Sequence, residues 1–254
     1  MSDEPALAPR VVHRDDDLIV FDKPTGLPTT SPDGGRCLAS LARGLDPQAV
    51  RMHPSSRLDA EVTGLVTFAR SDRGIRALLH ARGVGAYQRC YVGLCASAPE
   101  PPTGELRWAI GKDPRDPRRR QALPEGSKHG VNALSGYELV ASAQAAALLL
   151  LRPQTGRTHQ LRVHICAAGA PLLGDKHYGG ATRVVLADGR VVRARRVMLH
   201  CARVVLPSLT GEGQLLLRAP IPDDMAQLWR ELGGDAAVLS ALELRLSALD
   251  AASR

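Results

Sequence analysis

The chain has 254 residues, of which 44% are hydrophobic and 23% are charged, so a chain that is disordered throughout is excluded. This length is sufficient to bury a sizeable core. Thirty-three Lys and Arg residues against 26 Asp and Glu residues give a formal net charge of +7, which favours a polyanionic partner such as nucleic acid. A basic enzyme without such a partner would have the same charge balance.

No stretch approaches the roughly 18 uninterrupted apolar residues that a membrane span requires. The first five residues, Met1-Ser2-Asp3-Glu4-Pro5, do not form a cationic and then apolar signal pattern. We therefore expect a cytoplasmic protein without a membrane association. The five cysteines are odd in number and scattered along a long chain, which indicates reduced core thiols.

The first half of the chain is predicted to begin with a loose tail over residues 1–10. An apolar run over residues 17–22 predicts a buried strand that enters the loop 23–28, where Pro and Gly residues cluster. Residues 65–68 predict a second buried strand. Ser71 is a helix N-cap candidate, because apolar residues recur after it at helical spacing.

The second half is predicted to be mostly strands, over residues 87–94, 131–140, 145–151, 198–206 and 214–218. A helix follows Gly156 and ends at Gly169-Ala170-Pro171. Further helices begin at Asp223 or Asp224 and at Ala236, so that helices occupy about 223–254. This pattern favours an α+β fold with a mixed, largely antiparallel central sheet flanked by helices. No internal repeat or long linker divides the chain, so we expect a single domain over residues 1–254.

One segment, Arg57-Leu58-Asp59-Ala60-Glu61-Val62-Thr63-Gly64-Leu65, places a carboxylate in a loop directly before a buried strand. Such a loop holds a side chain rigidly and leaves it accessible from one side. An aspartate that only makes turn hydrogen bonds is the ordinary alternative. A carboxylate acts as a nucleophile only when it is ionised, and an arginine from the distant segment Thr155–His164 could stabilise that charge.

Tyr91 is a candidate for contact with an unstacked base. Strand alternation over Gln88–Leu94 puts Arg89, Tyr91 and Gly93 on one face. The chain has only eight aromatic residues, and an aromatic ring near a nucleic-acid site can stack on a splayed base. A core tyrosine with a satisfied hydroxyl would fit the same pattern.

Two arginine-rich segments, Arg115–Arg120 and Arg190–Arg196, lie among turn-forming residues and are predicted to be loops. They could contact a phosphate backbone or form solvated loops, and both interpretations stay open. A metal site is not expected, because His159 and His164 are five residues apart, whereas two ligands on one helix face are three or four apart. No phosphate-binding Gly-x-x-x-x-Gly-Lys loop is present, so no cofactor is expected.

Several blocks of this chain resemble, in order, the signature blocks of the pseudouridine synthases, in the family named after the RluA enzyme. The resembling blocks are Val20–Thr29, Arg57–Leu65, Gln88–Leu94, Thr155–His164, Gly169–Gly179 and Val197–Arg203. Three positions depart from the usual form: Ser56 replaces a histidine, Val62 a threonine, and Arg89 a lysine. The resemblance implies a pseudouridine synthase fold with a central RNA-binding cleft.

The resemblance also implies roles for individual residues. Asp59 would be the catalytic nucleophile or base, and Arg57 would border the RNA beside the extruded nucleotide. Tyr91 would stack on the target uracil, Arg157 would pair with Asp59, and Leu199 would form an apolar wall of the uracil pocket. Whether Asp59 attacks a carbon or removes a ribose proton stays open.

The implied activity is an isomerase that converts specific uridines in rRNA or tRNA to pseudouridine by base flipping, with no cofactor, no metal and no obligate protein partner. An N-terminal S4-type RNA-binding domain is expected to be missing, because fewer than twenty residues precede the first block. The alternatives are a non-catalytic RNA-binding protein on the same scaffold and a metal-dependent phosphodiesterase-like hydrolase.

Overall fold

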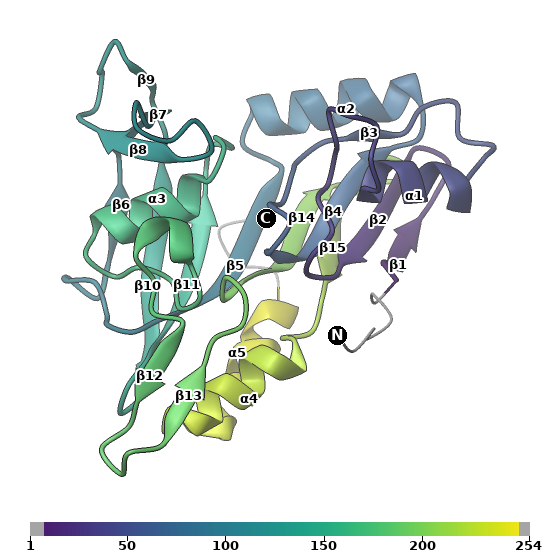
Figure 1. The fold of residues 1–254 in the computed structure, drawn as a ribbon. Coiled ribbons are helices and arrows are strands. Elements are labelled where there is room, and N and C mark those ends of the chain that lie inside the picture. Colours follow the sequence, from purple (N-terminus) through teal and green to yellow (C-terminus); the bar gives the residue numbers. More distant parts are fainter. Residues whose placement is uncertain (1–7, 249–254) are drawn as a thin grey trace. The chain divides into compact units, whose positions relative to one another are not determined.

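The computed structural model describes residues 8–248, which form an α+β fold with a largely antiparallel sheet and five α-helices (Figure 1). The predicted fold class is therefore confirmed. By its internal contacts the chain divides into two compact units. Unit 1 contains the residues up to Gln88 together with Cys201–Ala219, and unit 2 contains Arg89–His200 and the residues from Pro220 onward. We describe each unit separately, and the single-domain expectation stays a prediction.

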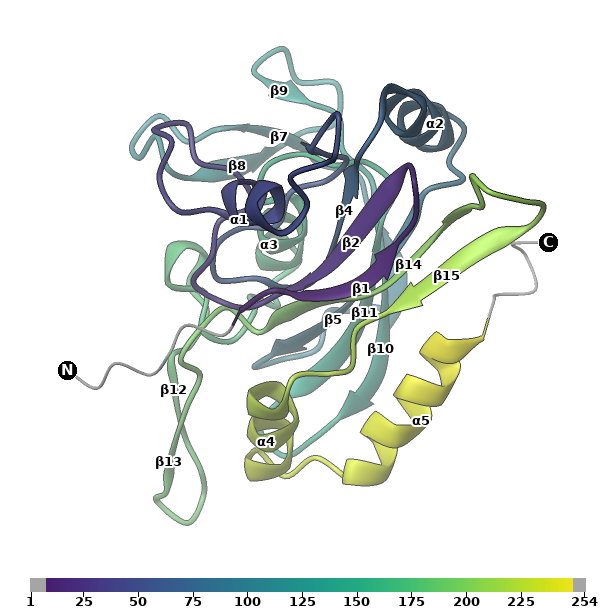
Figure 2. The same ribbon diagram turned by 90° about the vertical axis from the view of Figure 1, so that its right-hand side faces the viewer.

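Unit 1 is built on an antiparallel sheet with the strand order β1-β2-β4-β14. In addition β3 pairs with β4 and β15 pairs with β14. The strands and helices are β1 (Arg10–Arg14), β2 (Leu18–Lys23), α1 (Leu38–Leu45), β3 (His53–Pro54), β4 (Thr63–Ala69), α2 (Asp72–Gly83), β14 (Leu199–Pro207) and β15 (Gln214–Arg218). Edge strand β1 also contacts β15, and the two lie side by side in Figure 2. The sheet therefore curls around its apolar side chains.

The core of unit 1 explains why the predicted strands form. Residues Leu18–Phe21 of β2 are all buried, so both faces of this strand are covered. The Phe21 and Phe68 rings of β2 and β4 meet edge to face, with their centroids 5.7 Å apart. Helix α2 begins at Asp72 as predicted, because the Ser71 hydroxyl accepts a hydrogen bond from the N–H of Gly74.

Unit 2 contains the antiparallel strands β5-β11-β10-β6, the small sheet β8-β7-β9, the hairpin β12-β13, and three helices. The bounds are β5 (Gln88–Cys95), β6 (Thr103–Leu106), β7 (Ala109–Lys112), β8 (Arg120–Leu123), β9 (Gly130–Val131), β10 (Ser135–Ser142), β11 (Ala147–Pro153), α3 (Gln160–Ala167), β12 (Arg183–Val185), β13 (Val191–Arg193), α4 (Asp223–Glu231) and α5 (Ala236–Ser247). A 3-10 turn, η1, covers Lys176–Tyr178.

Four sequence expectations differ from the structure. The predicted strand 131–140 is interrupted, because Leu134 bonds to the loop after β11 and β10 begins only at Ser135. Part of the predicted loop 190–196 forms strand β13. The predicted tail 1–10 overlaps β1 at Arg10, and its first seven residues lie outside the described residues. The last predicted helix ends at Ser247, and residues 249–254 also lie outside them.

Within residues 8–248, no helix combines the length and the apolar character needed to cross a membrane. Each of the five cysteines is a free thiol.

Candidate active site

The loop from Arg57 to Val62 carries the predicted catalytic carboxylate into β4. Arg57 is exposed, Leu58 is buried and Asp59 is half-buried. The backbone N–H of Val62 donates to the carbonyl oxygen of Asp59 at 3.1 Å, so Asp59 opens a tight turn. Asp59 therefore lies on a short, constrained loop with a partly accessible side chain.

The hydroxyl of Thr29 fixes the residue next to Asp59. It accepts a hydrogen bond from the N–H of Leu58 at 2.9 Å and donates one to the carbonyl oxygen of Leu58, also at 2.9 Å. Thr29 is only 2% exposed. One buried hydroxyl therefore satisfies both backbone groups of the residue that precedes the carboxylate, without any regular secondary structure.

Lys23 holds the other end of the same loop. Its side chain is fully buried, and the ammonium group donates hydrogen bonds to three carbonyl oxygens: those of Pro24 (2.9 Å), Leu27 (2.7 Å) and Ala60 (3.2 Å). A buried charge is tolerated only when hydrogen bonds replace its water shell. The N–H of Gly26 also donates to the carbonyl oxygen of Ala60 at 2.8 Å. The loop 23–29 and the Asp59 loop are thus locked together.

The structure explains why the motif has a glycine at position 64. Its φ is +106°, in the region that favours glycine, and a Cβ atom here would collide with the backbone carbonyl of Cys201 on β14. A side chain at this position would push β4 away from β14. Gly64 of the sequence motif therefore permits close strand packing directly after the Asp59 loop.

In unit 2, β5 presents Tyr91 and Gly93 on one face, as strand alternation predicted. A Cβ atom on Gly93 would lie 2.9 Å from Cδ2 of Leu172 and 3.7 Å from Cδ1 of Leu199. The structure therefore places Leu199 against the face of β5 that also carries Tyr91. Tyr91 is 4% exposed and Leu199 is 3% exposed. Contact of these two side chains with a uracil ring stays a prediction.

The loop that carries Arg157 is held by the side-chain amide of Gln160. The amide oxygen accepts from the Thr155 hydroxyl at 2.8 Å and from the N–H of Arg157 at 2.9 Å. The amide nitrogen donates to the carbonyl oxygen of Leu134 at 3.0 Å and to the Ser135 hydroxyl at 2.8 Å. Gln160 is 5% exposed, and all four of its hydrogen-bonding positions are used.

His164 extends this network into the core of unit 2. Its Nε2 atom lies 3.0 Å from the carbonyl oxygen of Trp108, which can only accept, so Nε2 carries the proton. Its Nδ1 atom lies 3.0 Å from the Ser135 hydroxyl. Burial lowers the pKa of His164, although the Trp108 carbonyl acts in the opposite direction. The neutral form therefore completes a chain of hydrogen bonds that reaches the backbone of Arg157.

Other polar residues of this block make contacts within unit 2. The buried guanidinium of Arg162 donates two hydrogen bonds to Asp175, at 2.7 and 2.8 Å, and lies 5.0 Å from the centroid of the Tyr178 ring. His159 has a φ of +57°, and its Nδ1 atom lies 2.7 Å from the Tyr178 hydroxyl.

The predicted site residues belong to both units. Arg57 and Asp59 lie in unit 1, whereas Tyr91, Arg157 and Leu199 lie in unit 2. Arg157 is exposed, and its Nε–H donates to the carbonyl oxygen of Asn132 at 3.2 Å. The pairing of Arg157 with Asp59 stays a prediction. The resemblance implies that Lys23-Pro24 shapes a loop near the site, whereas Thr29, in the same resembling block, was not identified as a positioning residue.

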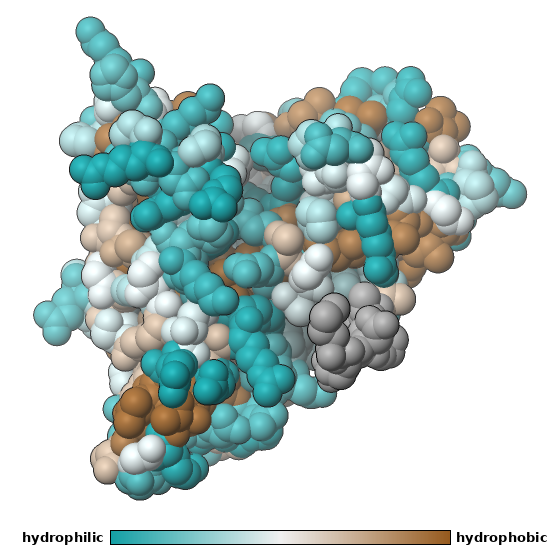
Figure 3. Space-filling view, viewed as in Figure 1, coloured by the Kyte–Doolittle hydropathy of each residue, from teal (hydrophilic) through white to brown (hydrophobic). Residues whose placement is uncertain are grey.

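Both arginine-rich segments contain arginines that are paired with carboxylates. In the turn between β7 and β8, Arg118 forms an ion pair with Asp116 and Arg119 lies 3.7 Å from Asp113. In the second segment, Arg190 lies 2.6 Å from Asp188 and Arg196 lies 2.6 Å from Asp224. In the β12-β13 hairpin, Arg183 stands opposite Arg193. The end of this hairpin also exposes apolar surface, seen at the lower left of Figure 3, where Val185 is 68% exposed.

Within the described part of the chain, no three His, Cys, Asp or Glu side chains gather closely enough to hold a metal ion. The residues that surround Asp59 and Arg157 are instead hydrogen-bonding side chains that fix loops.

Comparison with known proteins shows which family this chain is similar to. A family model described as RNA pseudouridylate synthase matches residues 17–167. An uncharacterised RNA pseudouridine synthase of Zymomonas mobilis is 31% identical over 232 residues, which cover 88% of this chain and 99% of that protein. The ribosomal large subunit pseudouridine synthase D of Nitrosomonas europaea is 33% identical over 233 residues, which cover 88% of this chain and 65% of that protein.

Among solved structures, human RNA pseudouridylate synthase domain containing 1 superimposes with a TM-score of 0.70. The match covers 98% of each chain at 23% sequence identity. At this identity the likeness concerns the fold.

Proposed function

Since this chain belongs to the RNA pseudouridylate synthase family and is an isomerase that converts uridine in RNA to pseudouridine, we propose that it modifies specific uridines of rRNA or tRNA, with Asp59 as nucleophile or base. The observation that carries the proposal is the locked Asp59 loop, in which Thr29 and Lys23 fix the backbone on both sides of the carboxylate. Ribosomal RNA of the large subunit is favoured as substrate, because two relatives are large-subunit synthases.

The reaction breaks the N1–C1′ glycosidic bond and forms a C5–C1′ bond in its place. The proton on C5 leaves to solvent and N1 gains a proton, so no oxidant or reductant is needed. Asp59 would begin this exchange either by attacking a carbon atom or by removing a ribose proton. A carboxylate held within about 1 Å of its productive position contributes much of the rate in such a step.

The target uridine must leave its stack before Asp59 can reach it. Extrusion costs a few kcal/mol, and the cost is smallest in loops and single strands. Arg57 is exposed two residues before Asp59, where its guanidinium could contact the backbone of the extruded nucleotide. Tyr91 would stack on the uracil and Leu199 would line the pocket, while Arg157 would pair with Asp59.

The test uses an in vitro transcript of large-subunit rRNA labelled with tritium at C5 of uridine, because each turnover releases the C5 hydrogen. We expect the wild-type chain to release tritium and Asp59→Ala to release none, while Asp59→Ala binds the transcript within a few fold of wild type. Normal turnover by Asp59→Ala would refute the assigned role. Tritium release only from tRNA transcripts would move the substrate to tRNA.

The two arginines of the Thr155–His164 block can be separated by a matched pair of variants. Arg157 is exposed, whereas Arg162 is buried and bound to Asp175. We expect Arg157→Lys to lower kcat at an unchanged urea midpoint, and Arg162→Lys to lower the urea midpoint. If kcat fell in Arg162→Lys and not in Arg157→Lys, the role of pairing with Asp59 would be assigned to Arg162.

A further inference from the structure

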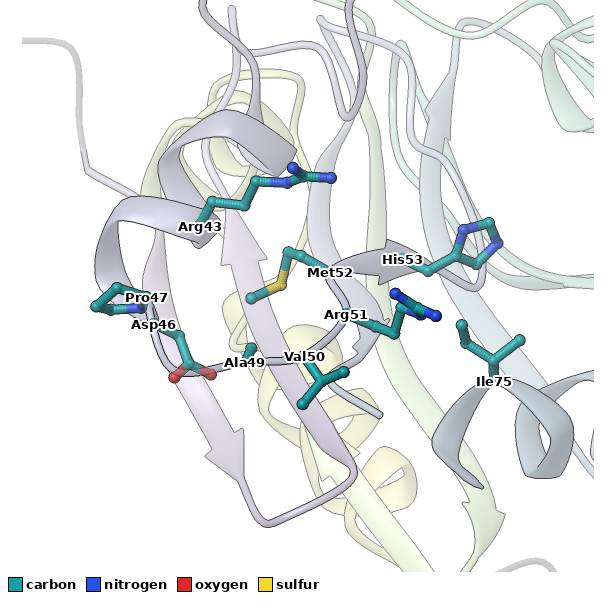
Figure 4. Close-up of a pocket in the computed structure, with 9 residues that line it drawn as sticks. All are labelled: Arg43, Asp46, Pro47, Ala49, Val50, Arg51, Met52, His53 and Ile75. Carbon is teal, nitrogen blue, oxygen red and sulfur yellow. The ribbon is translucent and has the colours of Figure 1, made fainter. Parts of the chain in front are cut away.

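A pocket of about 720 Å³ opens on unit 1, between the end of α1, strand β3 and the first turn of α2 (Figure 4). Its volume lies in the range of about 300–1,000 Å³ that is usual for small-ligand sites. The lining residues are Arg43, Asp46, Pro47, Ala49, Val50, Arg51, Met52, His53 and Ile75. None of these residues belongs to the Asp59 loop.

The pocket is lined by basic groups over an apolar wall. Arg43, Arg51 and His53 are exposed, and Figure 4 shows their charged or polar ends extended toward the same side. Met52 is buried at 7% exposure, whereas Val50 is 73% exposed. Guanidinium groups beside apolar surface can hold a phosphate and cover the adjoining sugar or base at the same time.

The acidic residue of the pocket does not cancel this charge. The carboxylate of Asp46 is fully buried, forms an ion pair with Arg70 and accepts a hydrogen bond from Arg14 at 2.8 Å. The hydrogen bond from Arg70 keeps the pKa of Asp46 below its ordinary value. Two arginines therefore compensate one carboxylate, and the surplus at the site is positive.

The remaining arginines of the pocket are available to a ligand to different extents. Arg51 shares its charge with Asp72, which is itself exposed. Arg43 forms no ion pair with any residue that the structure describes. An exposed guanidinium without a carboxylate partner, at the rim of a cavity of this size, is suited to an anion.

The position of the pocket along β4 indicates which part of an RNA ligand it could bind relative to the nucleotide at the Asp59 loop. His53 pairs with Ala69 at the end of β4, while the Asp59 loop enters β4 at Thr63. Six residues separate Thr63 from Ala69, and a strand rises about 3.3 Å per residue, so His53 lies about 20 Å along β4 from Thr63, where the Asp59 loop ends. This distance is too long for one nucleotide to occupy both places.

Exposed basic side chains mark the path between the two places. Between the pocket and the Asp59 loop the chain runs back along β4, where the N–H of Ser55 donates to the carbonyl oxygen of Thr67 at 2.8 Å. Arg51, His53 and Arg57 are exposed along this segment, while Met52 and Ser55 are buried. One polyanionic strand could therefore contact Arg51, His53 and Arg57 in turn.

We propose that this pocket binds the phosphate backbone of the substrate RNA, several nucleotides away from the target uridine. Arg43 and Arg51 contact the phosphate, and Val50 and Met52 cover the adjoining sugar or base. Phosphate contacts of this kind set the register of a protein on a nucleic acid without reading its sequence. This inference rests on the proposed function, because the ligand is the RNA that presents the uridine to Asp59.

The test compares Arg43→Gln with Arg230→Gln, which removes the same charge from an exposed position on α4 that does not line the pocket. Affinity for the rRNA transcript is measured at several KCl concentrations, together with kcat and KM. For Arg43→Gln we expect an affinity about fivefold lower, as for loss of one exposed ion pair. We also expect a slope of log K against log salt that is smaller by about 0.7–0.9, with kcat unchanged.

Arg230→Gln is expected to keep the wild-type slope. An Arg43→Gln slope equal to that of Arg230→Gln would overturn the proposal. A second outcome would also overturn the proposal: uridine monophosphate shifts the His53 NMR signals of the wild-type protein, while the wild type and Arg43→Gln bind RNA with equal affinity. These outcomes concern binding alone, and absence of tritium release by the wild-type chain would instead refute the proposed substrate.

Discussion

The Thr29 hydroxyl offers a sharp test of how the Asp59 loop is held. Thr29→Val keeps the branched shape of the side chain but removes the hydrogen bonds to the N–H and the carbonyl oxygen of Leu58, both at 2.9 Å. Thr29→Ser is the matched control, because it keeps the hydroxyl and removes only a methyl group. Thr29→Val therefore tests the two hydrogen bonds, and Thr29→Ser measures the contribution of the methyl group.

The expected magnitude follows from burial. Thr29 is 2% exposed and Leu58 is 6% exposed, so water does not readily replace the lost partner. A buried polar group left without a partner costs about 1–3 kcal/mol. Loss of one buried methyl group costs about 0.5–1.5 kcal/mol. We therefore expect Thr29→Val to lower the free energy of unfolding by about 2–4 kcal/mol, and Thr29→Ser by about 1 kcal/mol.

Urea unfolding measures the stability difference, and tritium release from the rRNA transcript measures turnover. Leu58 directly precedes Asp59, so a loop that shifts by about 1 Å should lower kcat up to about 100-fold with little change in RNA affinity. Thr29→Ser should retain most of kcat. Equal urea midpoints and equal kcat values for the two variants would show that the hydroxyl does not position the loop.

Three further predictions concern charge and pH. Arg157→Lys should lower kcat while RNA affinity stays within a few fold, because lysine cannot replace the bidentate geometry of arginine; unchanged kcat removes Arg157 from the mechanism. Burial lowers the pKa of His164, so this side chain binds a proton more readily in the unfolded chain than in the folded one. We therefore expect the free energy of unfolding to fall as pH drops below about 6.5. His164→Asn should flatten this part of the pH profile of unfolding. The hydrogen bond from Arg70 lowers the pKa of Asp46 from 3.8, so its stabilisation is present above about pH 4 and is lost as pH falls further. Asp46→Asn should therefore be less stable at pH 7 and should lose less stability in acid, and an unchanged acid slope would contradict this.

The sequence predicted those elements whose cause is local. The apolar run of β2 and the Ser71 cap of α2 each act within a few residues, and both elements form where expected. Helix α1 was missed, because its N-cap is Cys37, whose thiol accepts a hydrogen bond from the N–H of Ser40 in place of a usual hydroxyl or carboxylate. The unusual N-cap residue is the reason why this helix was not predicted.

The supports of the candidate site were not predictable for a different reason. Lys23 stands in a Lys-Pro turn, and lysines are rarely fully buried. Its acceptors include the carbonyl oxygen of Ala60, which is 37 residues away along the chain. Gln160 likewise reaches back to Leu134 and Ser135. Such contacts depend on which loops the fold brings together, and local pattern carries no information on that.

Both candidate loops are fixed by the same physical means, although they belong to different units. Thr29 binds both backbone groups of Leu58, and Gln160 binds the N–H of Arg157. A loop ordered in this way loses its conformational entropy during folding and not during RNA binding. The binding energy of the RNA would then be available for the proposed extrusion of the uridine, which costs a few kcal/mol. Variants that loosen either loop should therefore lower kcat, whereas variants of exposed phosphate contacts such as Arg43 should change affinity and its salt dependence.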